Sequence, residues 1–137
     1  MYRYTYVMKR ILLLSVITTF LINPLYSKNI SNRDCIEVAS EVNSSHAGMK
    51  LDQITIFENA ICPTDANLIY NYRINMDISS EIFKIAIPEM KTKNINTWCS
   101  DPTFKELIQV LDSVGFKYKN NNGAYLGKYT IDKSYCY

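Results

Sequence analysis

Apolar and polar side chains alternate strictly in the segment LIYNYRINM, residues 68–76, which is the most regular pattern in the chain. The apolar positions are Leu68, Tyr70, Tyr72, Ile74 and Met76. A period of two is typical of a strand that buries one face, so this segment predicts an antiparallel strand whose second face is solvated. Residues 49–57 predict a less regular strand before it, and the turn-forming residues 62–67 join the two.

Helical periodicity predicts a helix ahead of this hairpin and another after it. The sequence SNRD at residues 31–34 has the form of a capping box, apolar residues follow at three-residue steps, and Gly48 suits a C-terminal cap. Residues 78–98 are also helical in composition, with a serine cap at position 79 or 80. Because Pro88 interrupts this segment, we expect one helix to end or kink there and a short helix to follow to about residue 97.

The segment WCSDPTFKELIQVLDSVGF, residues 98–116, predicts a further helix. Ser100 or Asp101 is the expected N-cap, Pro102 takes the first helical position, where a missing N–H costs nothing, and Gly115 is expected to end the helix. Its core-facing stripe would consist of Phe104, Leu107, Ile108 and Leu111. Strands are expected at residues 116–119 and 124–131, joined by a turn with the Asn-Gly pair typical of hairpins.

In chain order, the predicted elements are therefore α-β-β-α-α-β-β. Two hairpins separated by helices favour the α+β class. The simplest arrangement is a four-stranded antiparallel sheet with the helices packed on its one apolar face.

The first residues of the chain have the pattern of a signal peptide. Lys9 and Arg10 precede an apolar run, residues 11–22, that is shorter than the roughly 20 residues of a membrane-spanning helix. We expect cleavage between Ser27 and Lys28, with Met8 as an alternative start of the leader.

Cleavage there divides the chain into a signal peptide, residues 1–27, and a single α+β domain, residues 28–137. The domain would reside in the periplasm or be secreted. No cysteine follows the apolar run closely and Cys35 is preceded by Asn-Arg-Asp, which is no lipobox, so we expect no lipid anchor.

The leader also accounts for the basic character of the full sequence, whose pI is about 8.3. Three of the 15 Lys and Arg residues lie in the leader, which leaves 12 against 13 Asp and Glu residues. The mature domain therefore has no net charge that would favour a nucleic-acid or anionic-membrane partner.

The four cysteines, Cys35, Cys62, Cys99 and Cys136, predict two disulfides, because an even number in a small exported domain is typical of a disulfide framework. Free thiols, or one bridge with a free pair, are the alternatives. No two cysteines are close in sequence and His46 is the one histidine, so we expect no metal site and no cofactor.

Cys99 stands just before a helix start, where the helix dipole could lower the pKa of a thiol and make it reactive. A nucleophile also needs a base, and neither a nearby histidine nor a C-x-x-C partner is evident. We therefore expect a disulfide between Cys99 and Cys136, which bracket a helix and a hairpin, and by default one between Cys35 and Cys62. The other connectivities stay open.

No known catalytic or nucleotide-binding motif occurs in the sequence. Several of the tyrosines in the domain can share a sheet surface, and tyrosine is favoured in protein interfaces. Tyr118, Tyr125 and Tyr129 are the candidate partner-binding surface, with ordinary cross-strand pairing as the alternative.

The C-terminal third also resembles two groups of small exported bacterial proteins, the quorum-sensing-regulated virulence factor family and the beta-type pilotins of the type II secretion system. The matching residues are Cys99-Ser100-Asp101-Pro102, Gly115, Tyr118, Gly123 and Cys136, with looser support from the LIYNYRI strand. The resemblance implies an α+β fold, a disulfide from helix to strand, and binding without catalysis. Pilotins escort a secretin subunit to the outer membrane by means of a lipid anchor; without a lipobox, this chain fits the soluble periplasmic branch better.

Two functions follow from these features. The first is a non-catalytic binding protein, a secretion accessory or virulence-associated factor, that holds a protein or peptide partner. The second is a periplasmic immunity or inhibitor protein that acts against a toxin or hydrolase. We expect no enzymatic activity, and a homodimer is left open.

Overall fold

The computed structural model describes residues 35–64 and 66–137. The predicted signal peptide, its cleavage site between Ser27 and Lys28, and the capping box at residues 31–34 lie outside the described residues. The elements are α2 (Cys35–His46), β1 (Thr55–Thr64), β2 (Asn67–Ile74), α3 (Ser80–Ser100), α4 (Pro102–Val110), β3 (Ser113–Lys119), β4 (Tyr125–Ile131) and the 3-10 helix η3 (Lys133–Tyr135). Helices and strands confirm the predicted α-β-β-α-α-β-β order and the α+β class. Within the described ranges, no helix is both long and apolar enough to cross a membrane.

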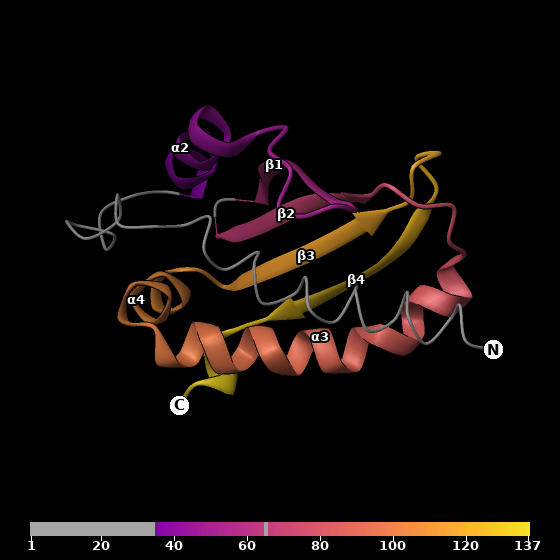
Figure 1. The fold of residues 1–137 in the computed structure, drawn as a ribbon. Helices are drawn as coiled ribbons and strands as arrows, with labels where there is room; N and C mark the ends of the chain where they lie inside the picture. Colours follow the sequence, from indigo (N-terminus) through magenta and orange to yellow (C-terminus); the bar gives the residue numbers. More distant parts are fainter. Residues whose placement is uncertain (1–34, 65) are drawn as a thin grey trace.

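The four strands form one sheet in the order β1-β2-β3-β4, but the sheet is mixed and not antiparallel as predicted. The outer pairs are antiparallel, whereas the central strands β2 and β3 are parallel. The length of α3 explains the difference, because 21 helical residues extend about 30 Å and an eight-residue strand about 26 Å. α3 returns the chain to the end of the sheet where β2 begins, and β3 therefore starts at that end too (Figure 1).

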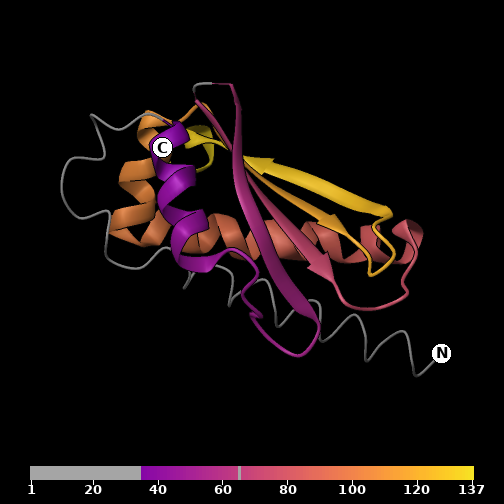
Figure 2. The same cartoon turned by 90° about the horizontal axis from the view of Figure 1, so that it is seen from above.

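The helices pack on one face of the sheet, as predicted. α3 runs along β4, α4 packs on α3, and α2 packs on β1. α2 and α4 lie at the same end of the sheet in both views (Figure 1, Figure 2). The buried strand residues of this face include Phe57, Leu68, Tyr70, Tyr72, Ile74, Val114, Phe116, Tyr118, Tyr129 and Ile131.

Pro88 lies inside α3 and does not divide it, so the prediction of two helices separated at this residue was wrong. A proline leaves the carbonyl four residues earlier, here that of Lys84, without a backbone partner. Lys84 and Pro88 are both exposed, so water can bind this carbonyl. The opposite side of α3 is held by packing of Phe83, Ala86, Met90, Asn94 and Trp98.

Two predicted boundaries also differ from the structure. The first strand spans Thr55–Thr64 instead of residues 49–57, because an irregularity between Phe57 and Asn59 breaks the alternation that would have revealed it. The last helix ends at Val110, and Gly115 lies inside β3. The N-cap of that helix is Asp101, whose carboxylate accepts from the backbone N–H groups of Thr103 and Phe104 at 2.9 and 3.2 Å.

Candidate functional site

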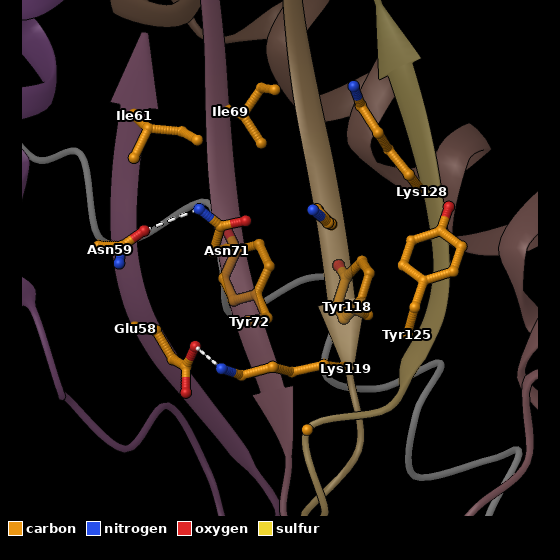
Figure 3. Close-up of a pocket in the computed structure, with 12 residues that line it drawn as sticks. Glu58, Asn59, Ile61, Ile69, Asn71, Tyr72, Tyr118, Lys119, Tyr125 and Lys128 are labelled. Carbon is orange, nitrogen blue, oxygen red and sulfur yellow. Dashed lines mark hydrogen bonds and ion pairs between the residues drawn. The ribbon is translucent and has the colours of Figure 1, made fainter. Parts of the chain in front are cut away.

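The face of the sheet turned away from the helices contains a shallow hollow of about 660 Å³. Its lining residues come from all four strands and from the β3–β4 turn: Glu58, Asn59, Ile61, Ile69, Asn71, Tyr72, Lys117, Tyr118, Lys119, Gly123, Tyr125 and Lys128. No described helix contributes to this lining. We call this surface the open face (Figure 3).

Strand register arranges the open face in three rows that cross the sheet. The ion-pair row consists of Glu58, Arg73, Lys119 and Tyr125; the amide–lysine row consists of Asn59, Asn71, Lys117 and Lys128; the apolar row consists of Ile61, Ile69, Gly115 and Thr130. These positions alternate with the buried residues of the helix face, as the pleat of a sheet requires. The rows therefore place polar, charged and apolar groups side by side on this face, and all of their members except Arg73, Gly115 and Thr130 line the hollow.

Glu58 neutralises one pair of neighbouring cations in the ion-pair row. Arg73 and Lys119 are register partners on the parallel strands β2 and β3. The irregularity in β1 adds Glu58 beside them, with Oε1 at 3.4 Å from Arg73 Nε and Oε2 at 2.8 Å from Lys119 Nζ. One carboxylate thus serves two cations that would otherwise repel each other.

The amide–lysine row has no such carboxylate. At its β1 end, Asn71 Nδ2 donates to Asn59 Oδ1 at 2.7 Å, which fixes both amides (Figure 3). At its other end, Lys117 and Lys128 are direct register partners, and both side chains are exposed. Within the described residues neither ammonium has an ion-pair partner, and the four strands contain Glu58 as their only carboxylate.

Gly115 lies between two lining residues of the hollow, Ile69 and Lys128. A Cβ atom at this position would lie 3.1 Å from Lys128 Cε and 3.3 Å from Ile69 Cγ1. The stem of Lys128 therefore lies over the β3 backbone and reaches toward β2, a path that a larger residue at position 115 would obstruct. This packing gives a reason for glycine inside a strand that differs from the helix-ending role predicted for it.

We expect the variant Lys117→Gln to raise the free energy of unfolding by about 0.5 kcal/mol, because like charges directly opposite each other destabilise a sheet. Urea unfolding followed by circular dichroism measures the difference, and it should disappear in about 1 M NaCl, where charges are screened within ~3 Å. Lys84→Gln, on the exposed side of α3, is the matched control and should leave stability unchanged. A loss of stability in Lys117→Gln would show that Lys117 has a stabilising partner.

The structure does not bring the three candidate tyrosines together. Tyr125 is 55% exposed on the open face, whereas Tyr118 and Tyr129 are 2% and 6% exposed, with their rings packed on Phe83 and Phe116. Tyr118 borders the hollow but presents almost no surface to it. The register shift between Tyr118 and Lys119 separates them, because it places one additional residue in β4 between Tyr125 and Gly127. Tyr125 alone of the three can meet a partner directly.

Tyr118 and Tyr129 belong instead to a buried hydroxyl network. Asn94 Nδ2 donates to Tyr129 Oη at 2.5 Å, and the two tyrosine hydroxyls are 3.4 Å apart. Burial raises the pKa of the Tyr118 hydroxyl well above its ordinary value of 10.0, and the neighbouring Tyr129 raises it further. Burial likewise raises the pKa of Tyr129 despite the hydrogen bonds from Tyr118 and Asn94.

This network predicts a loss of stability in alkali. The unfolded chain releases the two tyrosine protons near pH 10 while the folded chain retains them, so the free energy of unfolding falls as the pH rises above about 10. Each group contributes a slope of up to about 1.4 kcal/mol per pH unit. Urea unfolding at about pH 8 and about pH 11.5 should show a smaller fall for Tyr129→Phe than for the wild type. Tyr125→Phe is the exposed control, and an equal fall in all three proteins would contradict the argument.

All four cysteines form disulfides, in the pairs Cys35–Cys62 and Cys99–Cys136. The first bridge joins the start of α2 to β1, and the second joins the end of α3 to the segment after β4. Cys99 is therefore a structural half-cystine and not a free thiol. Among residues 35–64 and 66–137, no group of three or more His, Cys, Asp or Glu side chains is arranged to hold a metal ion.

The sequence contained part of the signal for the open face. The alternation of residues 68–76 already put Asn71 and Arg73 on the polar side of a strand, and the segment FKYK at 116–119 places Lys117 and Lys119 on one side as well. The pairing of Lys117 with Lys128 depends on the register of β3 and β4, and the position of Glu58 between two cations depends on the irregularity in β1. Neither feature was predicted from the sequence.

Comparisons with known proteins identify the fold class. No family model matches the chain, and no curated protein matches it in sequence. The α+β fold with one sheet and helices on one face is nevertheless present in solved structures. The chain has a pilotin-like fold.

Two of these structures are similar over most of their length. A "putative secreted protein" from Pseudomonas aeruginosa, PA3611, superposes with a TM-score of 0.62 at 12% identity, covering 73% of this chain and 87% of that one. The type 2 secretion pilotin EpsS from Vibrio vulnificus gives a TM-score of 0.59 at 10% identity, covering 75% of this chain and 88% of the pilotin. At these identities the likeness concerns the fold alone. It supports the expected resemblance to pilotins and adds no support for the virulence factor family.

Proposed function

We propose that this chain is an exported, non-catalytic binding protein that serves a secretion system as a pilotin-like accessory. The observation that carries the proposal is the open face, a hollow built from all four strands that no described helix covers. Its isoleucines and exposed tyrosine offer apolar contact area, and its amides and charged groups offer hydrogen-bond and ion-pair partners to a bound protein. The likeness of the fold to a type 2 secretion pilotin favours a secretion accessory among the binding functions.

The disulfides support export and binding without catalysis. Structural disulfides persist in oxidising compartments; here one bridge joins the start of α2 to β1, and the other joins the segment after β4 to the end of α3. They also occupy Cys99, the one thiol that the sequence suggested as a nucleophile. The buried hydroxyls of Tyr118 and Tyr129 keep their protons at neutral pH, so they are not suited to act as bases.

Export can be tested separately from binding. When the full chain is expressed in a Gram-negative host, the periplasmic fraction should contain a protein whose intact mass corresponds to residues 28–137 with both disulfides. Cytoplasmic retention of the uncleaved chain would contradict the proposed compartment.

Capture of a partner tests the binding function. The mature chain, folded with both disulfides and immobilised through its N-terminus, is incubated with a periplasmic extract of the source organism. Bound proteins are identified by mass spectrometry against a control of the same chain, reduced and alkylated. We expect enrichment of a secretion-system component by the folded chain only.

Two results would overturn the proposal. Enrichment of a toxin or hydrolase would replace the secretion role by that of an immunity protein. Absence of any enriched protein, together with hydrolase activity of the purified chain, would exclude a binding protein of either kind.

A further inference from the structure

We propose that the open face binds an acidic, partly apolar polypeptide segment, with its carboxylates on Lys117 and Lys128 and its apolar side chains on Ile61 and Ile69. This inference rests on the proposed binding function and names the chemistry of the partner. It starts from the charges of the sheet. The strands contain four cations, Arg73, Lys117, Lys119 and Lys128, against one carboxylate, and all of them lie on the open face.

The two pairs of neighbouring cations differ in whether a carboxylate neutralises them. Arg73 and Lys119 share Glu58, which contacts both. Lys117 and Lys128 stand opposite each other without a carboxylate, an arrangement that costs stability in the free protein. Two adjacent lysines in a hollow that lacks a carboxylate for them favour binding of an anion, because each ammonium gains a charge-assisted hydrogen bond when the anion is present.

The neighbouring apolar row narrows the class of anion. Ile61 is 44% exposed and faces Ile69 directly across β1 and β2, beside the fixed amides of Asn59 and Asn71 (Figure 3). A polypeptide segment that carries acidic and apolar side chains matches both rows at once. A free phosphate or a glycan carboxylate would use the lysines and leave the isoleucines exposed.

Two other occupants fit less well. A second copy of the chain that docked by the same face would bring four cations against four, since symmetric dimer interfaces are self-complementary. An anionic bilayer is flat, whereas Lys117 and Lys128 line a hollow into which a single segment can project. Charge complementarity and shape therefore favour an acidic segment of a different protein.

The experiment uses the disulfide-intact mature chain, labelled with ¹⁵N, and a short capped peptide composed of Glu, Val and Ser. A matched peptide has Gln in place of each Glu. Backbone amide shifts report binding and its location, and we expect the acidic peptide to perturb Ile69, Lys117 and Lys128 while the Gln peptide does not. Binding should weaken as NaCl is raised, because the contacts are between charges.

Matched variants test the two lysines. We expect Lys117→Gln with Lys128→Gln to weaken binding of the acidic peptide about tenfold or more, since it removes both charge-assisted contacts. The control Lys84→Gln with Lys133→Gln removes two exposed charges outside the sheet and should change binding by less than about twofold. Both double variants retain the core and both disulfides.

Three results would overturn the proposal: equal binding of the Gln peptide, binding that is unaffected by the variant of Lys117 and Lys128, or lysine-dependent binding of phosphatidylglycerol vesicles without binding of the peptide. Its failure can be distinguished from failure of the proposed function. If the variant of Lys117 and Lys128 captures the same periplasmic partner as the wild type, the binding function stands and this surface is excluded. If neither the wild type nor the variant captures a partner but the acidic peptide binds through the two lysines, the assignment of this surface is retained and the secretion role is excluded.

Discussion

The variant Cys99→Ala with Cys136→Ala is expected to lose about 4 kcal/mol of unfolding free energy, because the bridge closes a loop with a sequence separation of 37 residues. A domain of this size is stable by about 5–15 kcal/mol, so the loss is a large share of the total. The melting temperature should fall by about 15 °C or more. Alanine is the appropriate replacement because it introduces no hydroxyl into a half-buried site.

The same variant should also loosen the segment after β4, residues 132–137. Besides the bridge, the segment after β4 is held by exposed contacts: Lys91 Nζ donates to Tyr135 Oη at 2.8 Å, and Lys105 Nζ lies 4.9 Å from the centre of the Tyr137 ring. Exposed contacts of this kind contribute little. Hydrogen exchange should therefore show rapid opening of residues 132–137 in the variant.

The other bridge supplies the matched control. Cys35→Ala with Cys62→Ala opens a loop with a sequence separation of 27 residues and should cost about 3.5 kcal/mol, with the segment after β4 still protected. Urea unfolding by circular dichroism compares both variants with the wild type. Equal stability of the wild type and the variant of Cys99 and Cys136 would exclude a stabilising role for that bridge.

The fold was predictable wherever a local pattern determined the result. Asp101 and Pro102 have the chemistry of a helix start, and they begin α4 as expected. The alternation of residues 68–76 marked β2, which runs Asn67–Ile74. The Asn-Gly pair joined β3 to β4, with Gly123 at a φ of +82°.

Nonlocal packing determined what the sequence did not reveal. From sequence alone, Pro88 is expected to break the helix. In the structure, buried residues of α3 both before and after Pro88 pack in the core and keep the helix continuous. Gly115 looks like a helix terminator until Lys128 and Ile69 are seen to pack over it. The parallel pairing of β2 with β3 follows from the length of α3, which was predicted as two pieces.

The candidate site divides in the same way. Strand alternation placed Asn71 and Arg73 on the polar side of a strand. The contacts of Glu58 with Arg73 and Lys119 depend on an irregularity in β1 that no local sequence pattern predicts. The tyrosines show the opposite error. Residue type alone suggested that the three tyrosines share one surface. In the structure, strand alternation and the register shift between Tyr118 and Lys119 place Tyr118 and Tyr129 in the core and Tyr125 on the open face.

Replacement of Trp98 by alanine is expected to cost about 3–5 kcal/mol, the range for removing a large buried aromatic side chain. Trp98 is 1% exposed and joins α3 to α4 and to the sheet. Its ring stacks on Phe104 of α4 with centroids 4.7 Å apart and meets Phe116 of β3 and Tyr70 of β2 at 6.2 and 6.4 Å. Loss of the ring leaves a cavity beneath the parallel strand pair that supports the open face.

Circular dichroism at increasing urea is the suitable measurement, because Trp98 is the only tryptophan and its fluorescence is lost in the variant. Ile85→Ala, on the exposed side of the same helix, is the control and should change stability by less than about 0.5 kcal/mol. Trp98→Phe should recover roughly half of the loss, since it restores part of the contact with Phe104. If Trp98→Ala lost less unfolding free energy than Ile85→Ala, the packing of α3 on the central strands would not depend on the Trp98 ring.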